Sequence, residues 1–329
     1  MIEFFGGNGH MARRREQLLS ATRQLAIRDQ RPGLGTLPKV SGSWPVEGRS
    51  DLEELAGSPT QWQPIAGRYG VEVWRVTGPQ GEWMLKVGRN EGGAEVAREA
   101  AVWGRIAGMV PATAHGKHVR HGRSAETAWL TTPWLRGQSL WAMFHPVRER
   151  TGQHAEALAA SIQACMAIAA VHQAQWVHGD LQPHHIILMP GRAQLIDWAW
   201  GWSPSSDLPA PSTRGDSLVH LSGHELIART RSGQGPVLIS QADEVWTLAA
   251  SLWWAAAGQW PRDYRALGID PTAFTPTELS KVILRNDPPL GHIDHWPELE
   301  GALRTVLESS VETRPDVLDL AQCLRGLNP

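Results

Sequence analysis

Two aspartates on either side of a short strand pair constrain the fold of this chain more than any other feature. The segment HGDLQPHHIIL at 178–188 places Asp180 shortly before an apolar run, and LIDWAWG at 195–201 places Asp197 at the end of the next one. A Pro-Gly turn joins the two runs, so we expect two short strands. A chance HGD tripeptide would carry no weight, but strand, turn, strand and a second aspartate together indicate a site with two carboxylates.

The composition describes a globular chain without a dominant charge. Its 329 residues include 31 Lys and Arg and 33 Asp and Glu, a net charge of −2, and 42% are hydrophobic. This balance gives no electrostatic argument for a nucleic acid or an anionic membrane as partner. The 17 Trp, set against 2 Tyr and 4 Phe, fall mostly inside apolar segments and are interpreted as core aromatics.

The cysteines and the N-terminal residues favour a cytoplasmic protein. Cys165 and Cys323 are the two cysteines and lie far apart, so the chain is not built on disulfides. No apolar stretch reaches the roughly 18 residues of a membrane span. The start, MIEFFGGNGHMARRR, has no apolar core before its arginines. Nothing in the sequence therefore predicts export or a membrane anchor.

The chain divides into three regions of different character. Residues 1–60 are interpreted as an N-terminal extension, a helical pattern followed by a stretch rich in Pro, Gly and Ser. Residues 61–136 are β-rich with one helix, residues 137–329 are mainly helical, and 197–224 is loop-like. The expected strands are 70–76, 82–87, 128–135, 186–189 and 194–196, and the expected helices are 12–29, 94–106, 156–175, 244–257, 277–284, 297–307 and 316–327. The predicted class is α+β.

The segments HGDLQPHHIIL and LIDWAWG resemble the catalytic loop and the metal-binding motif of the protein-kinase-like superfamily. Their spelling is closer to aminoglycoside phosphotransferases and some bacterial kinases. The resemblance implies a bilobal fold, with a small β-rich N-lobe at 61–136 and a larger, mainly helical C-lobe at 137–329. It also implies that Asp180 orients the acceptor hydroxyl and takes its proton, and that Asp197 binds the Mg²⁺ that bridges the phosphates of ATP.

Two upstream residues resemble the phosphate-anchoring pair of the same superfamily. Lys86, in WMLKVG, lies where the anchoring lysine is expected, on the third strand of the small lobe. Glu99, in AREAAVWGRI, would pair with it, and Glu95 is the alternative one turn earlier. A lone lysine on a strand is usually solvated, so this assignment depends on the downstream motifs.

The remaining nucleotide contacts are implied by weaker matches. A loop over the phosphates is expected in AGRYGVEV, where Gly67 and Gly70 permit close backbone approach, although an ordinary hairpin turn explains the same residues. The stretch WLTTPWLRGQSL resembles the hinge between the lobes. There Thr132 would gate the pocket, and the adenine would bond backbone groups of Pro133 and Leu135.

The C-terminal region resembles protein kinases more than small-molecule phosphotransferases. SGHELIA and ETRPDVLDLAQCLRGL imply a buried ion pair between Glu225 and Arg314, whose loss would cost roughly 3 kcal/mol or more. Between them, ADEVWTLAASLWWAAAGQWP resembles the central helix that supports the catalytic loop. The resemblance covers the chain from about Trp62 onward.

Several residues depart from the family pattern. His185 stands where the family has a metal-binding Asn, and Gln182 where Ser/Thr kinases carry a phosphate-contacting Lys. Gly179 replaces the Arg that reads a phosphorylated activation loop, so switching by that modification is not expected. Imidazole is a poor ligand for Mg²⁺. The enzyme is therefore expected either to use one principal metal on Asp197 or to prefer Mn²⁺, with His185 as a ligand.

The function that the resemblance implies is transfer of the γ-phosphate of ATP to a Ser or Thr hydroxyl of a protein or peptide. Chains with HGDLQP and a Trp-rich central helix resemble stand-alone kinases of bacterial peptide tailoring, such as lanthipeptide biosynthesis, which implies a separate lyase acting in trans. Two alternatives stay open. One is a small-molecule phosphotransferase of the aminoglycoside type, and the other is a pseudokinase that binds or scaffolds.

Overall fold

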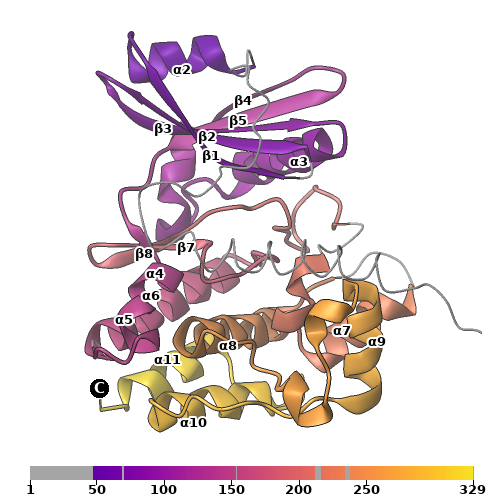
Figure 1. Ribbon diagram of the computed structural model, residues 1–329. Helices are drawn as coiled ribbons and strands as arrows, with labels where there is room; N and C mark the ends of the chain where they lie inside the picture. Colours follow the sequence, from indigo (N-terminus) through magenta and orange to yellow (C-terminus); the bar gives the residue numbers. More distant parts are fainter. Residues whose placement is uncertain (1–46, 69, 153, 212–215, 234–237, 329) are drawn as a thin grey trace, which may run out of the picture.

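The computed structural model describes residues 47–328, apart from 69, 153, 212–215 and 234–237. The described chain is mixed α+β, with a β-rich part first and a larger helical part after it (Figure 1). The predicted α+β class is confirmed, and the arrangement is compatible with a bilobal fold. The helix predicted at 12–29 lies outside the described residues.

Five antiparallel strands form the sheet of the β-rich part, in the order β1-β2-β3-β5-β4. Their bounds are β1 (Gln61–Arg68), β2 (Val71–Gly78), β3 (Gly81–Arg89), β4 (Arg120–Arg123) and β5 (Thr127–Pro133). β2, β3 and β5 were predicted, whereas β1 and β4 were not. Because cross-strand partners share a face, Lys86 lies on the same face as Val73 and Leu130, and Leu85 lies with Trp74 on the other.

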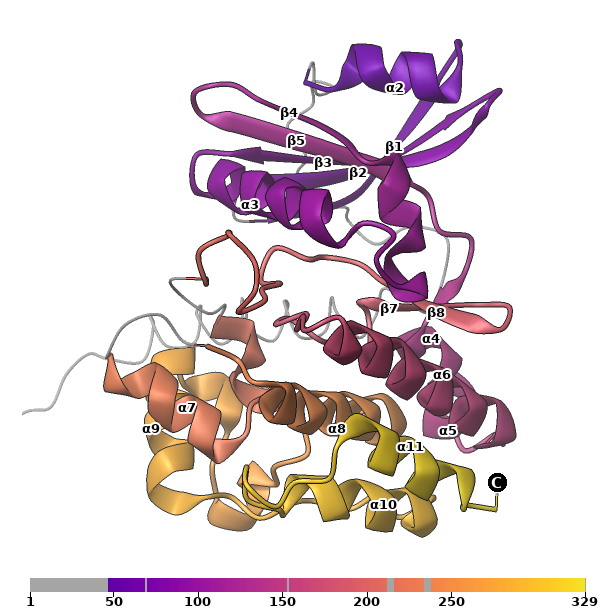
Figure 2. The same ribbon diagram turned by 180° about the vertical axis from the view of Figure 1, so that it is seen from behind.

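Helices cover both faces of this sheet. α2 (Arg49–Ala56) packs the fully buried Leu52 against Trp74 and Leu85 on the outer face. α3 (Glu91–Ile106) lies against the inner face, between the sheet and the helical part (Figure 2). The sequence analysis assigned 49–56 to an extension, but the burial of Leu52 makes it part of the β-rich core. The surrounding Pro, Gly and Ser residues concealed this short helix.

Glycines allow close backbone packing where the β1–β2 link, the end of β3 and the start of α3 meet. A Cβ on Gly88 of β3 would lie 2.0 Å from the carbonyl oxygen of Gly92 at the start of α3. Gly70, in the two-residue link between β1 and β2, has φ 76° and would bring a Cβ to 2.7 Å from the carbonyl oxygen of Arg89. A side chain at Gly88 would push α3 away from the sheet, and one at Gly70 would push the β1–β2 link away from the end of β3.

The helical part follows a second, three-stranded sheet in the order β6-β7-β8. Its elements are β6 (Gln138–Ser139), α4 (Leu140–Met143), α5 (His145–Arg148), α6 (His154–Gln173), β7 (Ile186–Met189), β8 (Arg192–Leu195), α7 (His224–Ser232), α8 (Gln241–Ala257), α9 (Pro276–Asn286), α10 (Pro297–Leu307) and α11 (Val317–Arg325). Short 3-10 helices lie at η1 (Pro111–His118), η2 (Asp216–Leu221), η3 (Tyr264–Leu267) and η4 (Pro271–Ala273). The predicted hairpin and five of the predicted helices are present. α7 and η2 were not predicted, and η2 lies where a loop was expected.

α6 is long and apolar enough to cross a membrane by length and composition alone. It has 20 residues, and 56% of its apolar window is buried inside the protein. It packs against α11 and β8 as an interior helix. No other helix in the described ranges meets the same length and hydropathy criteria.

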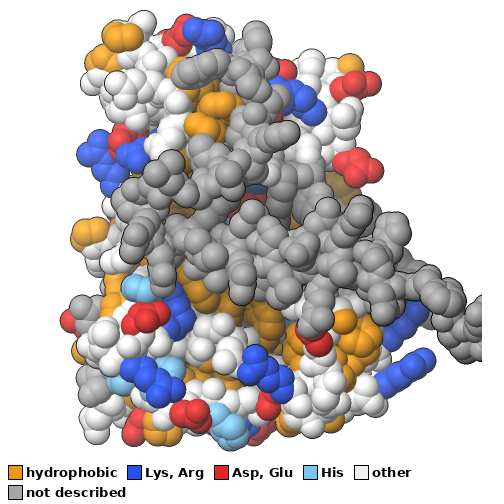
Figure 3. Space-filling view, in the orientation of Figure 1, with side chains coloured by type: hydrophobic (Ala, Val, Ile, Leu, Met, Phe, Trp, Pro, Cys, Tyr) orange, Lys and Arg blue, Asp and Glu red, His pale blue; other side chains and the backbone are white. Residues whose placement is uncertain are grey.

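Tryptophans fill the core around α8, as the composition predicted. α8 begins with a reciprocal capping arrangement between Ser240 and Asp243 and ends at Gly258, which has φ 69°. The largest fully buried side chains include Trp103, Trp198, Trp253 and Trp296. On the face shown in Figure 3, basic and acidic side chains are interspersed over the helical part, as expected from the small net charge.

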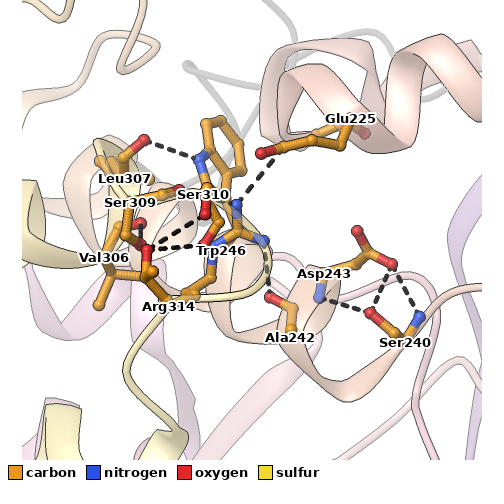
Figure 4. A network of polar contacts seen from close by, with 12 residues as sticks. Glu225, Ser240, Ala242, Asp243, Trp246, Val306, Leu307, Ser309, Ser310 and Arg314 are labelled. Atoms are coloured by element: carbon orange, nitrogen blue, oxygen red, sulfur yellow. Dashed lines mark hydrogen bonds and ion pairs between the residues drawn. The ribbon is translucent and has the colours of Figure 1, made fainter.

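Arg314 and Glu225, predicted as a buried ion pair, meet beside α8 (Figure 4). The Arg314 side chain is 1% exposed, but its contact with Glu225 Oε2 is long, at 3.5 Å, and Glu225 is 35% exposed. Arg314 also donates to the carbonyl oxygens of Ala242 and Ser309, each at 3.1 Å. Backbone carbonyls therefore bind most of this buried cation.

Replacing Glu225 with Ala should lower the free energy of unfolding by about 1–2 kcal/mol, less than the sequence alone suggested. The two carbonyls still bind Arg314, and solvent screens a partly exposed partner. Glu225→Gln, which keeps an acceptor, should cost less than about 1 kcal/mol. Urea unfolding of both variants measures this. A loss above 3 kcal/mol for Ala would mean that Arg314 depends on the carboxylate after all.

Candidate functional site

A buried lysine joins the β-rich part to the residues that follow β8. Lys86 of β3 is 6% exposed, and its Nζ lies 2.6 Å from Glu99 Oε2 on α3 and 2.9 Å from Asp197 Oδ1. Burial alone lowers the pKa of Lys86, but the Asp197 and Glu99 carboxylates outweigh it and raise the pKa above its ordinary value. Lys86 therefore stays charged. Of the two candidate partners on α3, Glu99 is the one found in contact.

Asp197 adopts a strained backbone conformation at the point where it meets Lys86. Its φ is 67°, in the left-handed region that non-glycine residues rarely occupy, at a cost on the order of 1–3 kcal/mol. The following amide, of Trp198, donates to Glu99 Oε1 at 3.2 Å and fixes this turn. Burial alone would raise the pKa of Asp197, but the Lys86 ammonium holds it well below its ordinary value. Asp197 is thus an ionised carboxylate in a fixed orientation.

Glu244 of α8 holds the Asp180 loop, which we define as residues 178–185. Its Oε1 accepts hydrogen bonds from the amides of His178, at 2.7 Å, and Gly179, at 2.9 Å, while Oε2 lies 2.9 Å from His172 Nε2. Burial alone raises the pKa of Glu244, but hydrogen bonds from His172 and the Gly179 amide lower it below the ordinary value. The sequence analysis did not single out Glu244. A carboxylate at the start of an apolar helix was the available signal.

His178 connects this loop to the strand that leads to Asp197. Its Nε2 donates to the carbonyl oxygen of Ile196 at 2.9 Å, which leaves Nδ1 to accept from the Asp180 amide at 3.3 Å. Gly179 has φ 79°, and a Cβ there would lie 2.5 Å from the carbonyl oxygen of Trp200. This crowding gives a physical reason for glycine at the second position of HGD.

Asp180, His185 and Asp197 form a cluster that could hold a metal ion, with donor atoms within 4.8 Å of one another. His185 Nδ1 bonds the backbone carbonyl oxygen of Asp180 at 2.8 Å, and because a carbonyl only accepts, Nδ1 carries the proton. In a neutral imidazole with this tautomer, Nε2 presents a lone pair, 3.6 Å from Asp197 Oδ2. Two acceptors that face each other favour a cation between them. A metal-binding histidine usually donates the hydrogen of its other ring nitrogen to a carboxylate or a backbone carbonyl, as Nδ1 does here.

Gln182 orients the carboxylate of Asp180. Its Nε2 donates to Asp180 Oδ1 at 2.9 Å, while Asp180 Oδ2 lies 3.7 Å from His185 Nδ1. The donor beside Asp180 is therefore the neutral amide of Gln182. A lysine at position 182 would instead place a positive charge there. One carboxylate oxygen is occupied by Gln182, and the other is left for a proton or a cation.

The other residues predicted to contact a nucleotide lie at the end of β5 and directly after it. Thr132 of β5 is buried and pairs with Met84, two residues from Lys86, so both share the inner face. Pro133 ends β5, and Leu135 follows in the link to β6. The linker backbone is tied to β3, because the amide of Trp134 donates to the Glu82 carbonyl at 2.9 Å.

The expected phosphate loop is two strand ends joined by a short turn. Gly67 is paired with Glu72 inside the β1–β2 ladder, and the conformation and crowding of Gly70 have the structural explanation given above. These features are those of a hairpin, and a phosphate contact at Gly67 and Gly70 stays a prediction.

The site as a whole combines one fixed cation with three carboxylates. Lys86 contributes one positive charge, and Glu99, Asp180 and Asp197 contribute three negative charges, which leaves a formal charge of −2. Such a site can bind a divalent cation, place a charged ammonium beside it, and offer Asp180 as a proton acceptor. A scan against protein-family models and a search of curated proteins found no match to this chain.

Proposed function

We propose that this chain is a cytoplasmic, ATP-dependent phosphotransferase with a protein-kinase-like fold. The observation that carries the proposal is the chain of contacts Glu99–Lys86–Asp197, whose members come from α3, β3 and the segment that follows β8. A buried charge that has no partner destabilises the folded protein, so charges buried at random would be unfavourable. Here every member is paired, and Asp180 lies within the same cluster.

Each residue has a distinct part in the proposed reaction. ATP would supply the phosphoryl group, and a divalent cation would neutralise the charge that develops during transfer. Asp197 and His185 would bind the cation, and Lys86, kept charged by Glu99, would contact phosphate oxygens. Asp180, oriented by Gln182, would take the proton of the acceptor hydroxyl.

The acceptor is proposed to be a Ser or Thr hydroxyl of a protein or peptide. The buried position of Arg314 near Glu225, which the sequence resemblance links to protein kinases, supports this choice over a small aminoglycoside-like molecule. Elimination of the phosphate by a lyase in trans would fit a peptide-tailoring role. The pseudokinase alternative is weaker, because Lys86, Glu99, Asp180 and Asp197 are all present and mutually arranged.

Radiolabelled γ-phosphate transfer tests the proposal and separates these alternatives. The purified chain is incubated with ATP and Mg²⁺ or Mn²⁺, with Ser- and Thr-containing peptides in one arm and aminoglycosides in the other. Label in a peptide supports the protein-kinase proposal, and label in the aminoglycoside supports the small-molecule alternative. Nucleotide binding without any transfer or hydrolysis would favour a pseudokinase.

Changing His185 to Asn should shift the metal preference from Mn²⁺ toward Mg²⁺. The lone pair of His185 Nε2 suits an ion that accepts nitrogen, whereas the Asn oxygen suits Mg²⁺. We expect Mn²⁺ binding, measured by calorimetry without nucleotide, to weaken by about tenfold or more. His184→Asn is the matched control, because His184 stacks on Trp141 and lies outside the metal cluster. Identical Mn²⁺ affinity and metal preference in wild type and His185→Asn would show that His185 is a packing residue.

A further inference from the structure

One arginine of α3, Arg98, is bonded to two positions of the chain segment that follows Asp197. We call residues 198–209 the post-Asp197 segment. Arg98 donates through one terminal nitrogen to the carbonyl oxygen of Gly201 at 2.9 Å, and through the other to that of Pro209 at 2.8 Å. A single planar guanidinium thus bonds positions eight residues apart and fixes the shape of the intervening loop.

Close packing places this segment directly against α3. A Cβ on Gly201 would lie 3.1 Å from Val102 Cγ1 and 2.9 Å from the Trp198 ring. Trp198 is fully buried, and its amide donates to Glu99, the residue next to Arg98. Neighbouring residues of α3 therefore bind both the start of the segment and Lys86, so a shift of the segment would move Glu99 as well.

The contacts of Arg98 involve backbone carbonyls only. Within the described part of the chain Arg98 forms no ion pair, and its Nε is buried without a partner. Backbone carbonyl oxygens are present whether or not a side chain is modified. The contacts of Arg98 with the segment therefore need no phosphorylated residue. Gly179, whose surroundings exclude a side chain, leaves no arginine in the Asp180 loop to read one.

We propose that Arg98 is a positioning residue that keeps the post-Asp197 segment and the Glu99–Lys86–Asp197 contacts assembled without any modification of the segment. The inference rests on the proposed function for its activity readout only. The protein would then be assembled for turnover from the moment it folds.

Arg105 provides a matched control on the same helix and the same segment. It pairs with Asp207 through two hydrogen bonds of 3.1 and 2.9 Å, but Arg105 is 40% and Asp207 73% exposed. Exposed ion pairs contribute little to the stability of the folded protein. Arg105→Ala therefore removes a contact with the segment while leaving the Arg98 contacts in place.

The experiment compares wild type with Arg98→Ala, Arg98→Lys and Arg105→Ala. Hydrogen exchange of the protein without nucleotide should accelerate about tenfold or more over 198–209 in Arg98→Ala, and change by less than about twofold in Arg105→Ala. At a temperature where every variant is folded, kcat should fall about tenfold or more in Arg98→Ala while the KM for ATP changes little, because misplaced catalytic groups lose turnover first. Arg98→Lys keeps the charge and the stem, and should recover part of both.

The outcomes separate this inference from the proposed function. Wild-type exchange in Arg98→Ala, or equal acceleration in Arg105→Ala, would overturn the role of Arg98. If the alanine variant does not fold, the lysine variant decides, because full wild-type exchange and turnover in it would show that the two-carbonyl fork is not needed. If wild type transfers no phosphate, the proposed function fails, and the exchange measurement still decides whether Arg98 holds the segment.

Discussion

Substitution of Asp197 by Asn is expected to abolish phosphate transfer and to weaken cation binding. The Asp197 carboxylate shares one oxygen with Lys86 and points the other toward His185, and its low pKa keeps it charged. Asn has the same shape without the charge, so Lys86 keeps one carboxylate instead of two and the cation loses its anionic ligand. Loss of a single charge-stabilising contact costs roughly 10²–10³ in kcat, and a metal ligand should cost at least that much.

The Asp180→Asn variant distinguishes an effect on the catalytic step from an effect on nucleotide binding. Turnover should fall to a similar extent, because an amide cannot accept the proton of the acceptor, while the affinity for ATP should stay nearly unchanged. Phosphate release and calorimetric titration with ATP, each with Mg²⁺ and Mn²⁺, measure the two effects. Wild-type-like turnover in Asp180→Asn would refute the proposed enzyme mechanism.

Replacing Glu244 with Ala should both unfold the site and destabilise the helical part. The change leaves two buried amides of the Asp180 loop and His172 without their partner, so we expect a loss of roughly 3–5 kcal/mol and almost no turnover. Glu244→Gln keeps an acceptor for the two amides and should cost markedly less. Urea unfolding and turnover of both variants check this. Equal stability of Glu244→Ala and wild type would show that the loop does not depend on Glu244.

The same carboxylate predicts how the stability difference changes with pH. The pKa of Glu244 in the folded protein lies below its ordinary value of 4.5, so its ionised form contributes stability that is fully present above that value. This contribution is lost as the pH falls through 4.5 toward the folded-state pKa. The difference in unfolding free energy between wild type and Glu244→Gln should therefore be constant near neutral pH and shrink in acid.

The residues with a distinctive sequence context were the ones that could be predicted. Asp180 and Asp197 lie in HGDLQPHHIIL and LIDWAWG, and the resemblance of these segments to known motifs singled them out; the same resemblance singled out Lys86 on a predicted strand. Glu99 was preferred to Glu95 because AREAAVWGRI resembles the helix that carries the partner of such a lysine. Each of these positions has a local pattern that any single sequence displays.

The residues that support them could not be predicted, because their partners are distant in sequence. Glu244 binds amides 65 and 66 positions earlier, and Arg98 binds carbonyls 103 and 111 positions later. Backbone amides and carbonyls exist at every residue, so no side-chain pattern marks them as partners. α2 was missed for a related reason, since its burial depends on the far side of a sheet that forms later in the chain.

The wide sequence separation of these contacts has a consequence for the order in which the protein folds. Lys86 and Asp197 are 111 residues apart, and the Asp180 loop depends on a helix 66 residues further along. Closing such long loops is entropically costly and is rewarded only when both ends are already structured. The site should therefore be among the last features to form, and a chain still emerging during synthesis, with α8 not yet docked, would have no competent site even though both aspartates had been made.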